Sequence, residues 1–137
     1  VKDQLPKGDF VVYTSPLKRC LKLALKISNN PIVDDRLMEL NFGDWELKPW
    51  NDIPMEDLQP WMKNYFNHPT KNGESMQELI VRVQDFLKVL KAQESSVIVV
   101  THAGVIRIIE GLSNNLDQSK WMNLKVAYGE VKVLSFD

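Results

Sequence analysis

The sequence stretch that most constrains the fold is the run Val97–Val100, in which every residue is apolar and β-branched. Four residues are too few for a helix, and an unbroken apolar run of this length is typical of a strand buried on both faces of a parallel sheet. The segment Thr101–Gly104 ("THAG") follows at once, and a helical pattern of apolar residues continues over 105–112. A buried strand that leads directly into a helix favours an α/β fold.

A second junction of the same kind lies near the N-terminus. Residues 9–14 ("DFVVYT") form a short β-branched and aromatic run that predicts a strand. Ser15 and Pro16 then suit the N-cap and the first position of a helix, which we expect to end near the two asparagines before Pro31. If the two strands are parallel, both junctions lie at the same edge of the sheet, where open α/β sheets bind their ligands.

The middle of the chain predicts two more helices. Apolar residues at helical spacing predict a helix over 75–92, with Ser75 and Glu78 as its capping box. A shorter, aromatic-rich helix is expected over 55–67. Residues 32–54 lack clean periodicity, so they predict a long loop with at most one short strand.

The C-terminal stretch completes the expected fold class. Residues 124–136 alternate apolar and polar side chains around a glycine, which predicts one or two strands. Strands separated by helical patterns indicate a three-layer α/β fold, with a mostly parallel central sheet and helices on both faces. No repeat or linker divides the sequence, so we expect a single domain over 1–137.

The overall charge and composition argue against several classes of partner. The formal net charge is −1 and the isoelectric point about 6.2, so we expect no nucleic-acid partner and no affinity for membranes. No apolar run approaches the ~20 residues of a membrane span. A single cysteine, Cys20, fits a reducing compartment, and we expect a cytoplasmic protein. Two distant histidines, His68 and His102, do not build a metal site, so we expect neither a metal nor a cofactor.

The residues around the two junctions suit a phosphoryl group. Amides at a helix N-terminus bind anions, and the small residues Ala103 and Gly104 would let a ligand approach the backbone closely. Arg19 can bind two phosphate oxygens at once, with His102 in the same pocket. The same residues are also compatible with purely structural roles: a solvated Arg19, a buried structural His102, and a Ser15 that only starts a helix.

A third patch, residues 34–50, concentrates carboxylates among aromatic side chains. The carboxylates are Asp34, Asp35, Glu39, Asp44 and Glu46. A carboxyl group beside aromatic rings can serve as a general acid near neutral pH, because an apolar environment favours its protonated form. Spacing does not select one of the five. The tryptophans of this patch are equally compatible with closing the core over a long loop.

Four segments, taken in order, resemble the histidine phosphatase superfamily, which has the phosphoglycerate mutase-like fold. These segments are "TSPLKRC", "LMELNFGDWE", "NGES" and "VVTHAGVIR". The alpha-ribazole phosphatase branch looks most similar, because of "ELNFGDWELKPW" and the "PWMKNYFNHPTKNGES" that follows. The resemblance covers nearly the whole chain. It implies a small phosphorylated substrate and no cofactor.

The resemblance also implies roles for individual residues. Arg19 would bind phosphate, Glu39 would protonate the leaving oxygen, and His102 would stabilise the transferring phosphoryl group. The implied reaction is the hydrolysis of a small phosphate monoester through a phosphohistidine intermediate. The substrate pocket would be completed by Ser15 and by the backbone amides of Ala103 and Gly104.

The sequence departs from the family pattern in two places. The family's nucleophile belongs to an Arg-His pair that ends the first strand, and no histidine or arginine precedes Tyr13 here. We therefore expect the chain to be N-terminally incomplete, without the first strand and helix of the fold, and inactive on its own. The alternatives are phosphoglycerate mutase-type phosphoryl transfer and a non-catalytic phosphate-binding domain. Leu47 stands where the family often has glycine, which a loop should tolerate.

Overall fold

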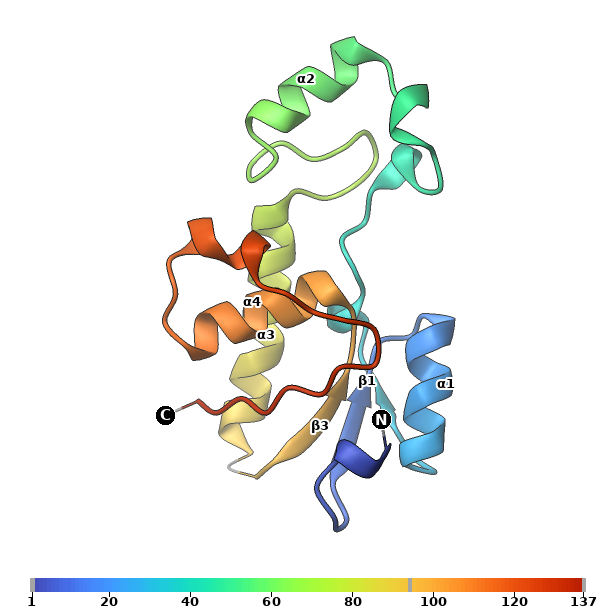
Figure 1. Cartoon of the computed structure of the whole chain (residues 1–137), viewed down its shortest axis with the longest axis vertical. Coiled ribbons are helices and arrows are strands. Elements are labelled where there is room, and N and C mark those ends of the chain that lie inside the picture. Colours follow the sequence, from blue (N-terminus) through green and yellow to red (C-terminus); the bar gives the residue numbers. More distant parts are fainter. Residues whose placement is uncertain (1, 94, 137) are drawn as a thin grey trace. The chain divides into compact units, whose positions relative to one another are not determined.

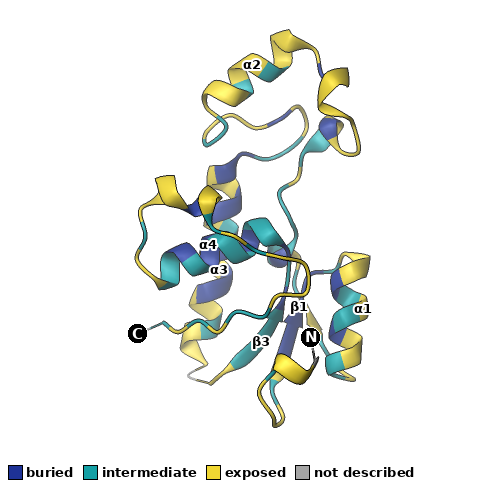
Figure 2. Cartoon of the chain, in the orientation of Figure 1, coloured by how far each residue is buried: buried dark blue, intermediate teal, exposed yellow. Residues whose placement is uncertain are grey.

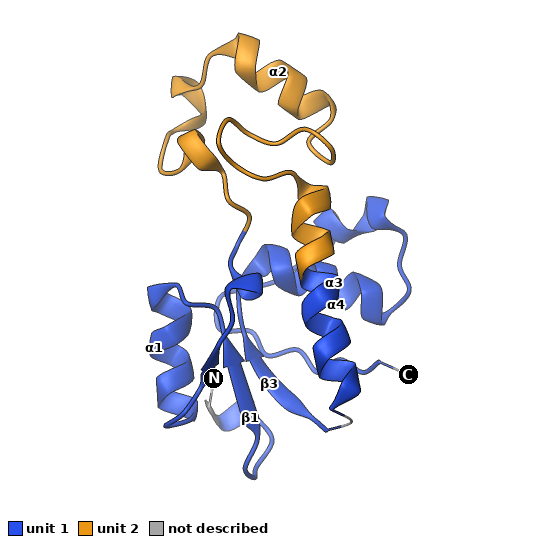
Figure 3. Cartoon of the chain, turned by 180° about the vertical axis from the view of Figure 1, so that it is seen from behind, with its two compact units in different colours: residues 1–39, 83–137 blue, residues 40–82 orange. Residues whose placement is uncertain are grey.

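The chain divides into two compact units, which are described separately. A computed structural model describes residues 2–93 and 95–136. Unit 1 comprises Val1–Glu39 and Val83–Asp137, and unit 2 comprises Leu40–Arg82 (Figure 3). The expectation of a single domain over 1–137 stays a prediction.

A small parallel sheet forms the centre of unit 1. Its strands are β1 (Val11–Thr14), β2 (Ile32–Val33) and β3 (Val97–Val100), and β1 lies between the other two (Figure 1). β1 pairs in parallel with both neighbours, and Val11 to Thr14 face Val97 to Val100 in register. The strands predicted from the two apolar runs and their parallel arrangement are therefore confirmed.

Helices cover both faces of this sheet. On one face, helix α1 (Lys18–Ile27) buries Cys20 and Ala24 against Val12 and Val100. On the other face, the ring of Tyr13 meets Phe86 of helix α3 (Met76–Ala92) edge-on, with ring centroids 5.4 Å apart. β1 is largely buried (Figure 2). Because side chains of successive strand residues point to opposite faces, its β-branched and aromatic run serves both layers. The predicted three-layer α/β architecture is confirmed.

The start of α1 differs from the prediction. The helix begins at Lys18, and its N-cap is Leu17, which makes no side-chain capping bond. Ser15 is instead fully buried, and its Oγ lies 2.9 Å from a ring nitrogen of His102. The N-cap prediction for Ser15 was wrong because a partner 87 residues away along the chain engages its hydroxyl group.

The C-terminal residues 124–136 form no strand, although their alternation predicted one or two. Side-chain contacts from helix α4 (Ala103–Ser113) hold this extended segment. Arg107 Nε donates to the carbonyl oxygen of Leu124 at 2.9 Å, and Ser113 Oγ donates to that of Ser135 at 2.7 Å. An alternating pattern describes extended chain, whether or not a neighbouring strand pairs with it.

Unit 2 is organised around Trp61 of helix α2 (Met55–Lys63). The Trp61 ring lies 5.4 Å from Trp45, 5.8 Å from Trp50, 5.9 Å from Tyr65 and 6.5 Å from Phe42, measured between ring centroids. The predicted helix over 55–67 is confirmed as far as Lys63. These rings form an aromatic cluster within unit 2, in which Trp45 is buried and Trp50 is 57% exposed.

Two loops of unit 2, residues 41–44 and 71–74, cross with direct backbone contact, and we refer to them as the loop crossing. Asp44 N donates to the Lys71 carbonyl at 2.9 Å, and Glu74 N donates to that of Asn41 at 2.8 Å. Gly43 has a φ of 56°, and a Cβ there would fall on the Lys71 carbonyl oxygen. Only glycine fits such a backbone approach.

The predicted capping box at the start of α3 is confirmed. Glu78 N donates to Ser75 Oγ, and Ser75 N donates to Glu78 Oε1, both at 3.2 Å. These two bonds satisfy backbone donors that the first turn of a helix leaves unpaired.

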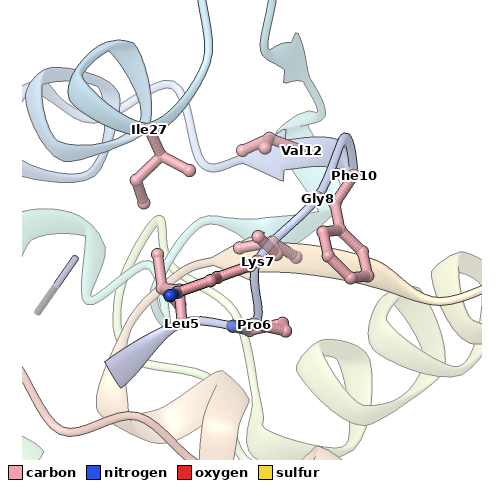
Figure 4. Close-up of a pocket in the computed structure, with 8 residues that line it drawn as sticks. Leu5, Pro6, Lys7, Gly8, Phe10, Val12 and Ile27 are labelled. Carbon is pink, nitrogen blue, oxygen red and sulfur yellow. The ribbon is translucent and has the colours of Figure 1, made fainter. Parts of the chain in front are cut away.

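A pocket of about 290 Å³ lies in unit 1 between the N-terminal segment, the end of α1 and the sheet (Figure 4). Most of its lining residues have apolar side chains, and Lys7 supplies the charged one. The residues that line it are Leu5, Pro6, Lys7, Gly8, Phe10, Val12, Ile27 and Ile98. None of the candidate site residues is among them. Among the described residues, no helix is long and apolar enough to cross a membrane.

Candidate active site

The candidate site lies in unit 1, at the carboxyl edge of the sheet. β1 ends at Thr14 and β3 ends at Val100, and Ser15 N donates to the Val100 carbonyl at 2.9 Å. This bond continues the parallel ladder by one residue and brings the two junctions together. The location is the one that the parallel arrangement predicted.

His102 occupies the N-cap position of α4 and is 5% exposed. Its Nε2 lies 2.9 Å from Ser15 Oγ. The sulfur of Cys20 lies 3.6 Å from Nε2 and 3.8 Å from Nδ1 of the same ring. Ser15, Cys20 and His102 therefore form a buried polar group, which we call the His102 cluster.

Cys20 is the member of this cluster that sequence reasoning missed. Its position next to Arg19 carried no chemical signal, because a cysteine on the buried face of a helix usually behaves as a small apolar residue. Burial raises the pKa of the Cys20 thiol, while the charge of Arg19 lowers it and the charge of Glu39 raises it. Both charges therefore act on a thiol that touches the His102 ring.

Arg19 lies in the first turn of α1 and is exposed. It follows β1 in the chain by one short connection, so it stands at the same sheet edge as His102. An exposed guanidinium there can receive an anionic ligand without losing a buried ion pair. The exposure of Arg19 is compatible with both interpretations made from the sequence, a phosphate-binding arginine and a solvated surface residue.

Glu39 reaches the N-terminus of α4. Its Oε2 accepts a hydrogen bond from Gly104 N at 3.0 Å, and a Cβ at Gly104 would fall on this carboxylate. Thr101 Oγ1 donates to the Leu37 carbonyl at 2.6 Å and so ties the segment before Glu39 to the end of β3. The carboxylate occupies the place at a helix N-terminus that suits an anion.

Three other carboxylates of the 34–50 patch, Asp34, Asp44 and Glu46, have partners of their own. Asp34 forms an ion pair with Arg36 at 2.7 Å, and the hydrogen bond from Arg36 holds the Asp34 pKa below its usual range. Asp44 accepts from Asn72, and Glu46 accepts from the backbone of Phe42, both within unit 2. Geometry thus singles out Glu39, which spacing did not.

The described residues offer no cluster suited to a metal ion. No group of three or more His, Cys, Asp or Glu side chains that could hold one occurs within residues 2–93 and 95–136. His68 is exposed in unit 2. The chemistry that the site residues can perform themselves is anion binding, hydrogen bonding and proton transfer.

The comparison with protein families gives one match, which spans residues 3–137. The matching description is histidine phosphatase superfamily (branch 1). Phosphoserine phosphatase 1 of Hydrogenobacter thermophilus is 28% identical over 120 residues, which cover 81% of this chain and 57% of that protein. The adenosylcobalamin/alpha-ribazole phosphatase of Escherichia coli is 30% identical over 108 residues, or 72% of this chain and 53% of that protein. The chain thus spans a little over half the length of these curated relatives.

Solved structures share the fold. The crystal structure of the alpha-ribazole phosphatase from Shigella flexneri superposes with a TM-score of 0.76 at 23% sequence identity, over 85% of this chain and 62% of that one. The native structure of mycobacterial glucosyl-3-phosphoglycerate phosphatase superposes with a TM-score of 0.72 at 21% identity, over 87% and 64% of the two chains.

Proposed function

The chain belongs to the histidine phosphatase superfamily, and we propose that it carries the phosphate-binding and proton-donating part of an enzyme that hydrolyses a small phosphate monoester. The observation that most supports this proposal is the hydrogen bond from Gly104 N, in the first turn of α4, to the Glu39 carboxylate. His102 occupies the N-cap position of the same helix. A proton donor, a ring nitrogen donor and an anion-binding helix end lie together there. Arg19 stands at the same sheet edge.

The proposed binding step uses the N-terminus of α4. A phosphate oxygen would accept hydrogen bonds from the first amides of the helix, at Ala103 and Gly104, and two further oxygens would contact the Arg19 guanidinium. Gly104 N is bonded to Glu39 in this structure. The incoming phosphate would therefore replace the carboxylate at this amide.

This replacement would prepare Glu39 for its proposed role. The negative charge of a bound phosphate beside a carboxylate favours the protonated form of the carboxyl group. A protonated Glu39 can then donate to the leaving-group oxygen as the P–O bond breaks. His102 would stabilise the charge that develops on the phosphoryl oxygens.

Neither histidine of this sequence is proposed as the nucleophile. The family resemblance places the nucleophile in an Arg-His pair, and the two histidines here, His68 and His102, follow Asn67 and Thr101. In the proposed reaction the nucleophile's ring nitrogen attacks phosphorus and the leaving alcohol takes the proton from Glu39. Water then cleaves the phosphohistidine and releases inorganic phosphate.

An alpha-ribazole 5′-phosphate-like ester is the substrate we propose. The support comes from the Escherichia coli relative named above and from the sequence around Asn41–Trp50. Phosphoserine is the competing substrate, supported by the Hydrogenobacter relative. Comparing kcat/KM for these two esters would decide between them, and equal values would contradict a nucleoside-type specificity.

The experiment that tests the function is a phosphate-release assay of the protein at its natural length. We expect His102→Ala to lower kcat by about 10³-fold and Glu39→Gln by about 10²-fold. Loss of the charged contact in Arg19→Ala should lower kcat/KM roughly 10- to 100-fold. His68→Ala is the matched control and should change neither kcat nor kcat/KM. Full activity in both His102→Ala and Arg19→Ala would contradict the proposal.

A non-catalytic phosphate-binding domain is the second candidate. The observation that favours it is that this sequence contains no Arg-His pair. It predicts that inorganic phosphate binds, and that Arg19→Ala weakens this binding, while no ester is hydrolysed at any protein concentration. Transfer of phosphate between positions of a phosphoglycerate without net release would instead identify a mutase. The cytoplasmic location and the lack of a nucleic-acid partner stay predictions from composition.

A further inference from the structure

We propose that Ser15 is a positioning residue that holds the imidazole of His102 in one orientation and one tautomer, with its proton on Nδ1. This inference rests on the proposed function, because it matters for catalysis only if His102 contacts the phosphoryl group. The substrate-binding role suggested for Ser15 by the family resemblance is thereby replaced by a role that acts through His102.

Burial is the first argument. Ser15 is 0% exposed, Cys20 6% and His102 5%. A buried ring nitrogen without a hydrogen-bond partner costs about 1–3 kcal/mol, so the partner of Nε2 is part of what fixes the ring. Ser15 Oγ, at 2.9 Å, supplies that partner. The Cys20 sulfur is a second, longer contact of the same ring, 3.6 Å from Nε2 and 3.8 Å from Nδ1.

The surroundings of the Ser15 hydroxyl group indicate the direction of the bond. Leu17 N donates to Ser15 Oγ at 3.3 Å, so this oxygen already accepts one hydrogen bond. Its own proton then has two acceptors in reach, Nε2 and the Cys20 sulfur, since a side-chain hydrogen bond from Ser15 lowers the pKa of the Cys20 thiol. Neutral imidazole carries one proton, and if Nε2 accepts from Ser15, that proton lies on Nδ1.

The backbone of Ser15 is held as firmly as its side chain. Ser15 N donates to the Val100 carbonyl at 2.9 Å, and Val100 is the last residue of β3, two positions before His102. The two residues are thus linked through both main chain and side chain. A hydroxyl group fixed in this way can impose one geometry on the ring rather than follow it.

The consequence for the proposed reaction is a preorganised donor. A neutral ring with its proton on Nδ1 presents an N–H group that can hydrogen-bond a phosphoryl oxygen without reorganising during the reaction. Loss of the Ser15 hydroxyl group would loosen the orientation of the ring and allow the other tautomer. We therefore expect a fall in kcat rather than in substrate binding.

Nitrogen NMR of the imidazole rings tests this inference, because the chain has only two histidines. In the ¹⁵N-labelled protein, His68→Gln assigns the His102 signals, and long-range ¹H–¹⁵N spectra report which ring nitrogen carries the proton. We expect His102 to show the Nδ1–H tautomer alone, whereas exposed His68 should show a mixture. Ser15→Ala should shift His102 toward the mixture seen for His68, and Ser15→Thr should restore the single tautomer.

Two matched variants separate the hydroxyl contact from general packing. Cys20→Ala removes the sulfur but keeps the Ser15 bond, so the tautomer should not change. Ser28→Ala removes a hydroxyl group just after the other end of α1, where the Ser28 oxygen accepts a hydrogen bond from Asn30 N. This variant should leave the imidazole rings of His68 and His102 unaffected. In the protein at its natural length, Ser15→Ala should lower kcat roughly three- to tenfold at unchanged KM, with recovery in Ser15→Thr.

An Nε2–H tautomer in the wild-type protein would overturn the inference, and this result needs no variant to fold. The same tautomer in wild type and in folded Ser15→Ala would overturn it as well. The spectra do not depend on turnover. A protein with the expected tautomer and no phosphatase activity would therefore contradict the proposed function, and an active protein with the wrong tautomer would contradict only the role of Ser15.

Discussion

The candidate site of unit 1 and the loop crossing of unit 2 are both built from the short motifs that resemble the phosphatase family, yet they are held together differently. In the site, side chains contact one another or a helix end: Ser15 contacts His102, and Glu39 contacts Gly104. In the loop crossing, direct backbone contacts, as between Asp44 and Lys71, are added to side-chain bonds such as that from Asn72 to Asp44. The site places its side chains at the carboxyl edge of the sheet, whereas the loop crossing brings two backbones so close that no Cβ fits at Gly43.

This difference indicates whether substitution of a motif residue should change mainly activity or mainly stability. Side-chain contacts can be removed while the fold persists, so substitutions in the site should change activity more than stability. Backbone contacts without room for a Cβ cannot be relaxed in this way, so substitutions in the loop crossing should change stability first.

The largest expected effect is on stability, from Gly43→Ala. The new Cβ would meet the Lys71 carbonyl at a residue whose φ is 56°, so steric overlap adds to backbone strain. We expect a loss of about 4 kcal/mol in the free energy of unfolding, measured with urea. Gly129→Ala is the control, because Gly129 also has a positive φ, of 73°, but is exposed. Equal losses in both variants would show that strain alone matters.

The next largest effect is on activity, from Gly104→Ala. The added methyl group would displace the Glu39 carboxylate, and we expect kcat to fall about 10²-fold. Stability should change by less than about 1 kcal/mol, because alanine favours the helix. The double variant with Glu39→Gln should be no slower than Glu39→Gln alone. Additive losses would mean that Gly104 acts through something other than Glu39.

A smaller, stabilising effect is expected from Leu47→Gly. Leu47 has a φ of 63° and a fully exposed side chain, at 102% of the reference area. Glycine relieves the strain of the left-handed backbone conformation without loss of packing. The free energy of unfolding should therefore rise by about 1 kcal/mol. Leu47→Ala removes the side chain but keeps the Cβ and should change little. A stabilisation by Leu47→Ala of the same size would point to exposed apolar surface instead.

The smallest effect concerns the pH dependence of unit 1. Burial raises the pKa of Cys20, so folding favours the protonated thiol. Below the usual pKa of a thiol both states are protonated and the contribution is constant. As the pH rises beyond that value, the unfolded chain loses its proton first, and stability falls. Cys20→Ser should show a weaker alkaline loss than wild type in parallel urea titrations, and identical pH profiles would contradict the assignment.

The sequence predicted the elements whose information is local. Four β-branched residues defined β3 to the residue, and the Ser75–Glu78 pair defined the start of α3. Residues 124–136 were predicted wrongly, because alternation marks extended chain but does not reveal whether a strand pairs with it. The contacts that hold this segment come from side chains of α4, such as Arg107.

The candidate site could be predicted only in part, for a related reason. The sheet edge followed from two parallel strands, and this placed His102 and Ser15 near each other. The contact between Glu39 and Gly104 joins residues 65 positions apart, and that between Ser15 and His102 joins residues 87 apart. No local pattern encodes these pairs. Cys20 was missed because its neighbour in space, His102, comes from another element.

The ring contacts around Trp61 give unit 2 an optical signal of its own. Three of the four tryptophans, Trp45, Trp50 and Trp61, lie in unit 2, while Trp121 belongs to unit 1. Indoles 5.4 and 5.8 Å apart should couple their strong far-ultraviolet transitions, and we expect a paired band there in circular dichroism. Buried Trp121, whose Nε1 donates to the Leu116 carbonyl, contributes emission without such a partner. Loss of the paired band before any red shift of the Trp121 emission would mean that unit 2 opens while unit 1 stays closed.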